Sequence, residues 1–539
     1  MATRDRFEEL FREVLAGRLT RRTALGTGAG LSAAAALGPL GAAAAPRGAA
    51  RSFAARRQDG TPKPGGVLKV GMQADPTALD PHKQSLTAIW HVVEHIYSRL
   101  TKILPDLSVG PELAESWEIS EDGLVYTFKL RQGVTFHNGR PLVAEDVKYS
   151  FERYGSEESV VRSDLASVES VEAPDDSTVV IRLKNRDASI LSILASQSAI
   201  IIPKEVVEEN GDLSQVAVGS GPFIFREYVP NTHVILEKNP NYFEEGLPYL
   251  DGLELIIAAD DTARTTALVT GTVDMIEYAP LRDIELLQSD PSIVLAGNSN
   301  TNIRMVSFNM KREPFNDVRV RQAIAKVIDR EAVLGPTVFG HGTTTVVPFP
   351  PDYWAALPAE VPAPDIEGAR ALLAEAGFPD GFKTTITSWA QYSFLSNAAV
   401  VIQEQLKQIG IEAELNLVEN ATMIADVHTN FNYDIAVTGT SAYVDPHEIM
   451  INFKTGESGN FVGYSNPQVD ELIDQGQAET DQEKRAEIYR QIQQILLDEV
   501  PWVCLFVANQ YEAMKSYVKG YTHIATGSNY TLRETWLDQ

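Results

Sequence analysis

"PELAESWEISEDGLVYTFKLRQGVTFHNGRPLVAEDVKYSFER", residues 111 to 153, carries the clearest folding pattern of the chain. In its middle, apolar residues alternate with polar or smaller ones, a period of two that predicts a strand: Leu124, Tyr126, Phe128 and Leu130. The Asn138-Gly139 pair is typical of a tight turn, and residues 141–154, with acids early, predict a helix. Together with a further strand in "STVVIRLK" (177–184), the stretch predicts a small α+β unit across residues 99–201.

Outside this unit the pattern differs. Upstream, "GGVLKVGMQADPTALDP" (65–81) predicts a short strand, and "TAIWHVVEHIYSRL" (87–100) a helix. Residues 305–505 alternate helical and strand-like segments, as α/β domains do, among them "VRVRQAIAKVIDREAVL" (318–334), "FKTTITSW" (382–389) and "YDIAVTGT" (433–440). A long helix near the end shows one apolar stripe with a period of 3.6, which predicts core packing: Ile488, Ile492, Ile495 and Leu496.

Composition restricts the function. The formal charge is -27, whereas binding to nucleic acid needs a basic face, so nucleic acid is not expected as a partner. Cys504 is the single cysteine of the chain, which rules out an intrachain disulfide, and its apolar surroundings predict a buried thiol. Without the N-terminal segment roughly 480 residues remain, more than one hydrophobic core normally serves, so at least two lobes are expected.

The N-terminus has the features of an export signal. "LTRRTALGTGAGLSAAAALGPLGAAAA" (19–45) places Arg21-Arg22 before a weakly apolar run that ends in small residues. This pattern predicts a twin-arginine-type signal over residues 1–45, with a retained N-terminal anchor as the alternative. Residues 46–66, rich in Ala, Arg, Gly and Pro, are expected to form a disordered tether. The remaining chain is predicted to be soluble and outside the cytoplasm, in the periplasm or at the cell surface.

No catalytic signature is present. The chain lacks G-x-S-x-G, a phosphate-binding loop, H-E-x-x-H and any spaced Cys/His metal set. His91 and His95 stand four apart in a predicted helix, but no third ligand is near them in sequence, and a metal site needs three or four donors. We therefore expect a binding protein with no cofactor and no metal, not an enzyme.

Blocks over nearly the whole mature chain resemble the family-5 extracellular solute-binding proteins, the peptide, nickel and oligosaccharide receptors of ABC importers. Residues 111–153 match the family signature of a Trp, a Tyr-x-Phe strand, an Arg-x-Gly-Val-x-Phe turn and an Ala-x-Asp-Val helix. Further matches are "VGSGPFIFREY", "EKNPNYF", "LDGLELIIAADDTARTTALVTGTVDMI", "FNMKREPFNDVRVRQAIAKVIDRE" and "GYSNPQVDELIDQG".

The resemblance implies an α/β, two-lobed class II periplasmic-binding-protein-like fold with an additional α+β subdomain inserted in lobe one. Lobe one would comprise residues 67–98, 202–303 and 506–539, the inserted subdomain 99–201, and lobe two 304–505. Two crossings, near "NTNIRMVSF" (300–308) and "WVCLFVANQ" (502–510), would act as the hinge of a closing cleft.

Ligand contacts are expected from loops that face this cleft, because binding residues are usually presented on loops of a rigid frame. Peptide-binding relatives carry an aspartate four residues before the proline of "TSAYVDPHEIM"; here that position is Ala442, so the anchor for a peptide's α-ammonium is missing. Asp445 could substitute for it, and aromatic rings in these loops could stack against the ligand. The predicted ligand-binding residues are His82, Trp354, Trp389, Tyr392, Tyr443, Asp445 and His447.

The resemblance thus predicts a receptor that captures a small solute, an oligopeptide or peptide-like compound, and delivers it to an ABC permease and its ATPase. A monomer is expected. The alternative within the fold is a receptor for an oligosaccharide or a chelated metal. Two interpretations from other functional classes stay open. One is a secreted hydrolase, which would turn its ligand over, and the other is a sensor that signals to a membrane partner.

Overall fold

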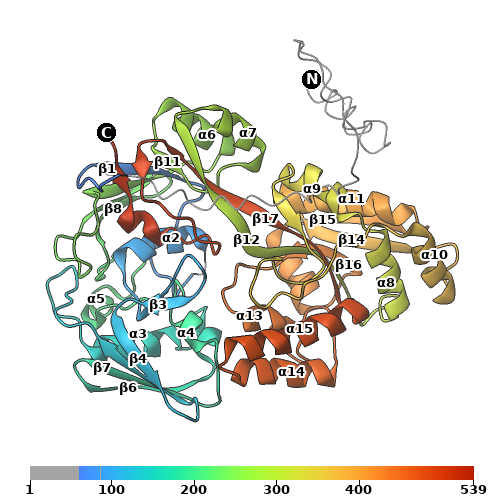
Figure 1. Ribbon diagram of the computed structural model, residues 1–539, viewed down its shortest axis with the longest axis horizontal. Helices are drawn as coiled ribbons and strands as arrows, with labels where there is room; N and C mark the ends of the chain where they lie inside the picture. The colour runs from blue at the N-terminus through green and yellow to red at the C-terminus, as the bar shows by residue number, and fades with distance from the viewer. Residues whose placement is uncertain (1–59, 85) are drawn as a thin grey trace, which may run out of the picture. The chain divides into compact units, whose positions relative to one another are not determined.

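The computed structural model describes residues 60–84 and 86–539 of the chain (Figure 1). The predicted signal over residues 1–45, with its twin arginines, lies outside the described residues, as do residues 46–59 of the predicted tether. The end of that tether is hydrogen-bonded: Gly65 N donates to Tyr249 O at 2.8 Å and Gly66 N to Asp251 Oδ2 at 2.9 Å. The folded chain therefore begins before Val67.

One large mixed sheet runs through the described chain. Its strand order is β15-β14-β16-β12-β17-β11-β1-β10-β9-β8, and β13 pairs with β17 outside this path. The strands are β1 (Val67–Met72), β8 (Phe223–Val229), β9 (His233–Lys238), β10 (Gly252–Ile257), β11 (Met275–Ile276), β12 (Ile293–Phe308), β13 (Gly342–Thr344), β14 (Lys383–Trp389), β15 (Glu412–Val418), β16 (Ile435–Gly439) and β17 (Trp502–Lys515).

Two long strands, β12 and β17, join the two halves of this sheet. They pair antiparallel from Ile293 opposite Lys515 to Ser307 opposite Trp502, with a register shift between Ser299 and Ile303, and they cross the middle of Figure 1 side by side. Gly297 is required in this ladder: its φ is 153°, and a Cβ there would lie 2.0 Å from the Gln510 carbonyl oxygen. The segments 300–308 and 502–510, expected to cross between lobes, lie within these two strands, and their role as crossings stays a prediction.

The stretch 111–153 folds as its pattern predicts. An antiparallel sheet of order β4-β5-β7-β6 is formed by β4 (Ala114–Ile119), β5 (Val125–Leu130), β6 (Val168–Asp175) and β7 (Thr178–Leu183). Helix α3 (Ala144–Tyr154) begins with a carboxylate cap, since Asp146 Oδ2 accepts from Val143 N at 2.9 Å. Phe128 and Phe151, buried in one cluster, join this sheet and helix. Two further strands, β2 (Thr101–Ile103) and β3 (Val109–Pro111), pair with each other beside them.

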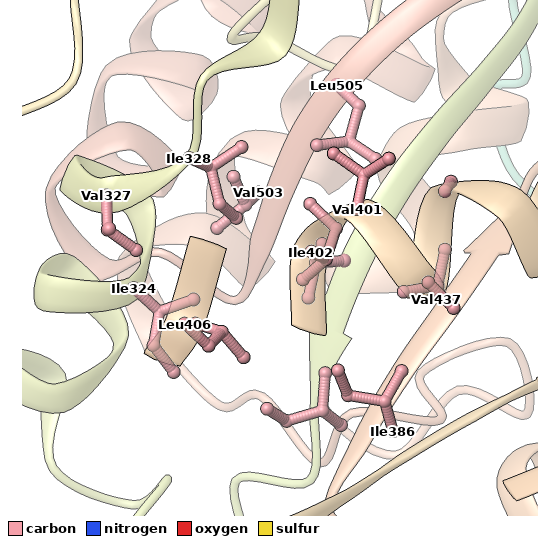
Figure 2. Packing of buried hydrophobic residues seen from close by; sticks show 14 of the residues in the cluster. Ile324, Val327, Ile328, Ile386, Val401, Ile402, Leu406, Val437, Val503 and Leu505 are labelled. Atoms are coloured by element: carbon pink, nitrogen blue, oxygen red, sulfur yellow. The ribbon is translucent and has the colours of Figure 1, made fainter. Parts of the chain in front are cut away.

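In the β14–β16 half of the sheet, helices bury an apolar cluster (Figure 2). The predicted helical segment 318–334 is divided there into α8 (Val318–Val327) and α9 (Arg330–Val338). The division occurs because the Asp329 side chain accepts from Ala332 N at 3.1 Å and starts a new helix. The labelled cluster residues are Ile324, Val327, Ile328, Ile386, Val401, Ile402, Leu406, Val437, Val503 and Leu505.

The remaining helices cover both halves. They are α2 (Thr87–Ile96), α4 (Ile190–Ile193), α5 (Lys204–Asn210), α6 (Asp261–Thr270), α7 (Ile284–Ser289), α10 (Ile366–Glu375), α11 (Ser393–Lys407), α12 (Asn420–Met423), α13 (His447–Met450), α14 (Pro467–Ala478) and α15 (Gln482–Glu499). Short strands β18 (Val518–Lys519) and β19 (Trp536–Leu537) pair near the C-terminus. Within residues 60–84 and 86–539, no helix combines the length and the apolar character that a membrane crossing requires.

Separate apolar clusters serve the separate parts of the chain. One contains residues from β1, α2, β9 and β10, a second lies between α3 and β4–β7, and two more lie among residues 305–508. The bounds of the lobes given above stay a prediction.

Candidate functional site

A cavity of about 1280 Å³ lies where the parts of the described chain meet. Its lining includes residues from α2, from the segments 161–198 and 261–282, and from the middle of β12 and β17. It also includes the end of α9, the start of α11 and the segment 441–457. Segments that are hundreds of residues apart in sequence thus face one space. A cavity built in this way can be shaped by movement of its walls.

The wall near α2 contains a buried polar cluster. His91 Nδ1 lies 2.5 Å from Glu277 Oε2, and both side chains are 3 % exposed. Glu277 Oε1 also accepts from Gln73 N at 2.8 Å, while Glu94 accepts from Asn529 N at 3.0 Å. These hydrogen bonds fix the two carboxylates, and His91 is the member of the cluster that lines the cavity.

The protonation of His91 should make stability depend on pH. Burial opposes its charged form, but the charge and the hydrogen bond of Glu277 outweigh burial and raise the pKa of His91 to about 9. The folded value exceeds the unfolded value of about 6.5, so the stabilisation is complete below pH 6.5 and is lost as the pH rises toward 9.

We therefore expect wild type to exceed His91→Gln in the free energy of unfolding by roughly 1 to 3 kcal/mol at pH 6, and the difference to vanish by pH 10. Urea unfolding of both proteins at several pH values measures it. A difference that stays constant with pH would show that the His91–Glu277 pair is not ionic.

Another part of the lining comes from the segment that follows strand β16 in the sequence. Tyr443 is 2 % exposed, its N–H donates to Thr301 Oγ1 at 2.9 Å, and its hydroxyl donates to Pro348 O at 3.2 Å. Glu448, in the short helix α13, lines the cavity and accepts from the backbone N–H groups of Val444 and Asp445. Glu448 remains exposed, but the protein around its carboxyl group displaces enough water to raise the pKa of Glu448 to about 7.

Of the seven predicted ligand-binding residues, Tyr443 and His447 lie in the cavity lining. His447 is buried, and burial lowers the pKa of its imidazole; its Nδ1 has no hydrogen-bond partner among the described residues. The imidazole thus lines the cavity with one buried ring nitrogen that no described protein group bonds.

The other five predicted residues lie outside the lining. Asp445 is 5 % exposed and forms a bidentate ion pair with Arg485, at 2.7 and 2.8 Å. His82 is buried between Arg153 Nη1 at 2.7 Å and Ser198 O at 2.8 Å. Their polar atoms are therefore already occupied by protein partners.

The three remaining aromatic residues also have protein neighbours. The Trp389 indole N–H donates to Asn420 Oδ1 at 3.0 Å, and the Trp389 and Tyr392 ring centroids are 5.9 Å apart. Tyr392 is 44 % exposed. The Trp354 ring lies 5.8 Å from the Arg485 guanidinium carbon. The ligand contacts expected of Trp354, Trp389 and Tyr392 stay predictions.

Most of the lining was not named by sequence reasoning; Arg304, Phe394 and Glu448 are the charged or aromatic examples that bear on the site. Arg304 had a detectable signal, since it is the single charged residue of the strand "IVLAGNSNTNIRMVSF" (293–308). Phe394 and Glu448 had none, because nothing local separates them from ordinary loop and helix residues. For metals, the residues that the structure describes include no group of three or more His, Cys, Asp or Glu side chains able to hold an ion.

Comparison with known proteins links this geometry to transport receptors. Residues 108–461 match the family described as bacterial extracellular solute-binding proteins, family 5. The oligopeptide-binding protein AppA of Bacillus subtilis is 29% identical over 515 residues, which cover 90% of this chain and 94% of AppA.

Solved structures agree. AgaA in complex with agropinic acid, from A. tumefaciens R10, is similar with a TM-score of 0.77 and 31% identity, over 88% of this chain and 99% of AgaA. AppA from B. subtilis in complex with a nonapeptide gives a TM-score of 0.75 and 28% identity, over 89% of this chain and 100% of AppA. The predicted α/β fold of periplasmic binding proteins is confirmed by these neighbours.

Proposed function

The chain belongs to the family 5 bacterial extracellular solute-binding proteins, and from this we propose that it captures a peptide or peptide-like solute and delivers it to a membrane permease. The similarity to the oligopeptide-binding AppA supports a peptide more than the alternatives, an oligosaccharide or a chelated metal. Members of this family are binding components of transporters. We extend this to a monomeric chain without catalytic activity that works with an ABC permease and its ATPase.

The observation that carries the proposal is the cavity. Its volume of about 1280 Å³ exceeds the ~300–1,000 Å³ of pockets for drug-sized ligands, which suits a ligand of several residues. Walls from both halves of the sheet enclose it, and β12 and β17 connect those halves. We propose that bending of these two strands closes the walls on the ligand, a population shift driven by contacts that exist only in the closed form.

We further propose that residues 1–45 direct export by the twin-arginine route, so that the receptor works outside the cytoplasm. Tyr443 and His447 are proposed as ligand contacts because they line the cavity. His82 and Asp445 would have to give up a protein partner to bind a ligand. The aromatic residues would have to contact it in addition to their present neighbours: Trp354, Trp389 and Tyr392.

Native mass spectrometry of the full chain, expressed with its own signal and purified without denaturant, tests the function. We expect a mixed set of bound compounds that fragment as short peptides, because a closed receptor releases its ligand slowly. A single bound sugar or metal complex would contradict the peptide proposal, and turnover of the bound compound would support a hydrolase instead.

A pair of variants shows whether the bound compounds occupy the cavity. Ala442 is exposed and lines it, so Ala442→Trp should fill part of the space and reduce the bound fraction. Ala374, exposed on α10 and outside the lining, provides the matched control Ala374→Trp, which should retain the compounds. Equal retention by both variants would place the binding site elsewhere.

A further inference from the structure

Arg304 occupies an unusual position for a charged residue. It lies in β12, one of the two strands that join the halves of the sheet, and it is partly buried with its side chain in the cavity lining. Its neighbour Ile303 is fully buried, and β12 residues on either side pair with β16 and β17. A guanidinium at this place loses much of its hydration, which is costly unless something compensates.

No protein group compensates the charge. Among the arginines of residues 60–84 and 86–539, Arg304 alone donates no hydrogen bond to the protein and forms no ion pair, and its Nε is buried without a partner. The other basic side chains of the lining that carry charge each pair with a carboxylate: His91 with Glu277, Arg99 with Glu112, Arg264 with Asp261, Arg282 with Asp261, and Lys454 with Asp474. A single cation in the cavity is thus left for a ligand.

The surroundings hold this cation in place. The Phe394 ring lies 5.0 Å from the Arg304 guanidinium carbon, a cation–π distance that orients the group without neutralising it. Gly439, opposite Arg304 in β16, leaves room for it: a Cβ at residue 439 would lie 2.7 Å from Arg304 Nη1. Two independent features, an aromatic support and a missing side chain, therefore position an unpaired guanidinium.

We propose that Arg304 is the anchor for a carboxylate of the ligand, so that the receptor selects solutes carrying an acidic group. The planar guanidinium presents two parallel N–H donors that match both carboxylate oxygens, and such charge-assisted bonds are strongest away from water. Burial lowers the pKa of Arg304 to about 10, which leaves the group charged at neutral pH. In a peptide the carboxylate is the C-terminus or an Asp or Glu side chain.

The hydroxyls near this anchor suit the same ligand group. Ser393 precedes Phe394, and Ser441 follows Gly439 by two residues; both line the cavity. Neither hydroxyl is hydrogen-bonded in the part of the chain that the structure describes, so both can donate to a carboxylate oxygen. This inference rests on the proposed function, because it assigns the chemical class of the solute that the cavity takes.

The test uses pools of tri- to pentapeptides with free C-termini and the same pools with amidated C-termini, equilibrated with the full chain and analysed by mass spectrometry. We expect wild type to retain free-acid peptides about 10- to 100-fold better than amides if the C-terminus is bound. If a side chain is bound, Asp- and Glu-containing peptides will be enriched from both pools. Arg304→Gln should remove the preference, and Arg304→Lys should restore part of it.

Two variants serve as references. Arg226→Gln removes an exposed arginine that pairs with Glu237 outside the lining, and it should bind as wild type does. Gly439→Ala leaves Arg304 in the sequence but displaces its guanidinium, so it should weaken retention of acids as Arg304→Gln does. This variant decides the question if Arg304→Gln does not fold.

The outcomes separate this inference from the proposed function. Equal peptide preferences in wild type and Arg304→Gln overturn the role of Arg304 but leave a peptide receptor. If wild type retains no peptide, the compound released from the natively exported protein is identified instead. If that compound is an acid and Arg304→Gln does not retain it, the role of Arg304 as anchor is supported and the proposal of a peptide ligand is wrong. If no compound with an acidic group is retained by either route, the inference is wrong.

Discussion

Replacing Glu112 with glutamine is expected to lower the free energy of unfolding by about 3 to 5 kcal/mol, the cost of leaving a buried opposite charge without its partner. Glu112 is 0 % exposed and lies between two arginines that are also buried. Its Oε1 accepts from Arg533 Nη1 and Nη2 at 3.1 and 3.2 Å, and its Oε2 from Arg99 Nε at 3.2 Å. An amide can satisfy neither guanidinium by charge and presents N–H donors to one of them.

The loss should be measurable as a lower midpoint of urea unfolding at pH 7. Glu205→Gln provides the control, because Glu205 pairs with Arg140 at 2.6 Å but is 37% exposed; an exposed pair contributes about 1 kcal/mol or less. Equal effects of the two substitutions would contradict the prediction. A larger effect of Glu112→Gln would show that the ion pair with Glu112 stabilises the C-terminal segment around Arg533.

The ion pair between Glu112 and Arg533 shows which contacts the sequence does not predict. The strand at residues 125–130 and the helix at 144–154 follow from alternation, from the Asn138-Gly139 turn and from acids at the helix start, all of which are local signals. Glu112 and Arg533 are 421 residues apart. No local pattern identifies such a partner, because the contact exists only after the whole chain has folded.

Helix boundaries were less predictable than helix positions. The segment 318–334 has one apolar periodicity, yet two helices form because Asp329 caps a second helix with its own side chain. Aspartate is common on helix surfaces as well as at caps, so an aspartate at residue 329 does not by itself predict that one helix ends and another begins there.

For the site, the sequence identified segments better than side chains. The loop after β16 was predicted to face the cleft, and Tyr443 and His447 of that loop line the cavity. Which way each neighbouring side chain turns depends on partners elsewhere: Asp445, two residues from both, is bound by Arg485 on α15. Arg304 differs from Asp445 in this respect. The strand pattern would place Arg304 in the core, but its guanidinium lacks the protein partner that a buried arginine needs.

Asp445→Ala is the second substitution with a large expected effect, about 3 to 5 kcal/mol in the free energy of unfolding, since it leaves Arg485 buried and unpaired. Arg485 is 6 % exposed, and only its Nε bond to Gly476 O at 2.9 Å and its Nη2 bond to Tyr489 Oη at 3.2 Å would remain. Urea unfolding at pH 7 measures the loss. The double variant Asp445→Ala/Arg485→Ala removes both charges and should be more stable than Asp445→Ala alone.

The double variant also separates the two roles that Asp445 can have. If the carboxylate serves the fold through Arg485, the folded double variant should retain free-acid peptides within about threefold of wild type, since Asp445 does not line the cavity. If the carboxylate instead replaces the aspartate missing at Ala442 and holds the ligand's ammonium, a folded double variant will lose these peptides. The geometry favours the first result, because both carboxylate oxygens of Asp445 are already bonded to a buried guanidinium.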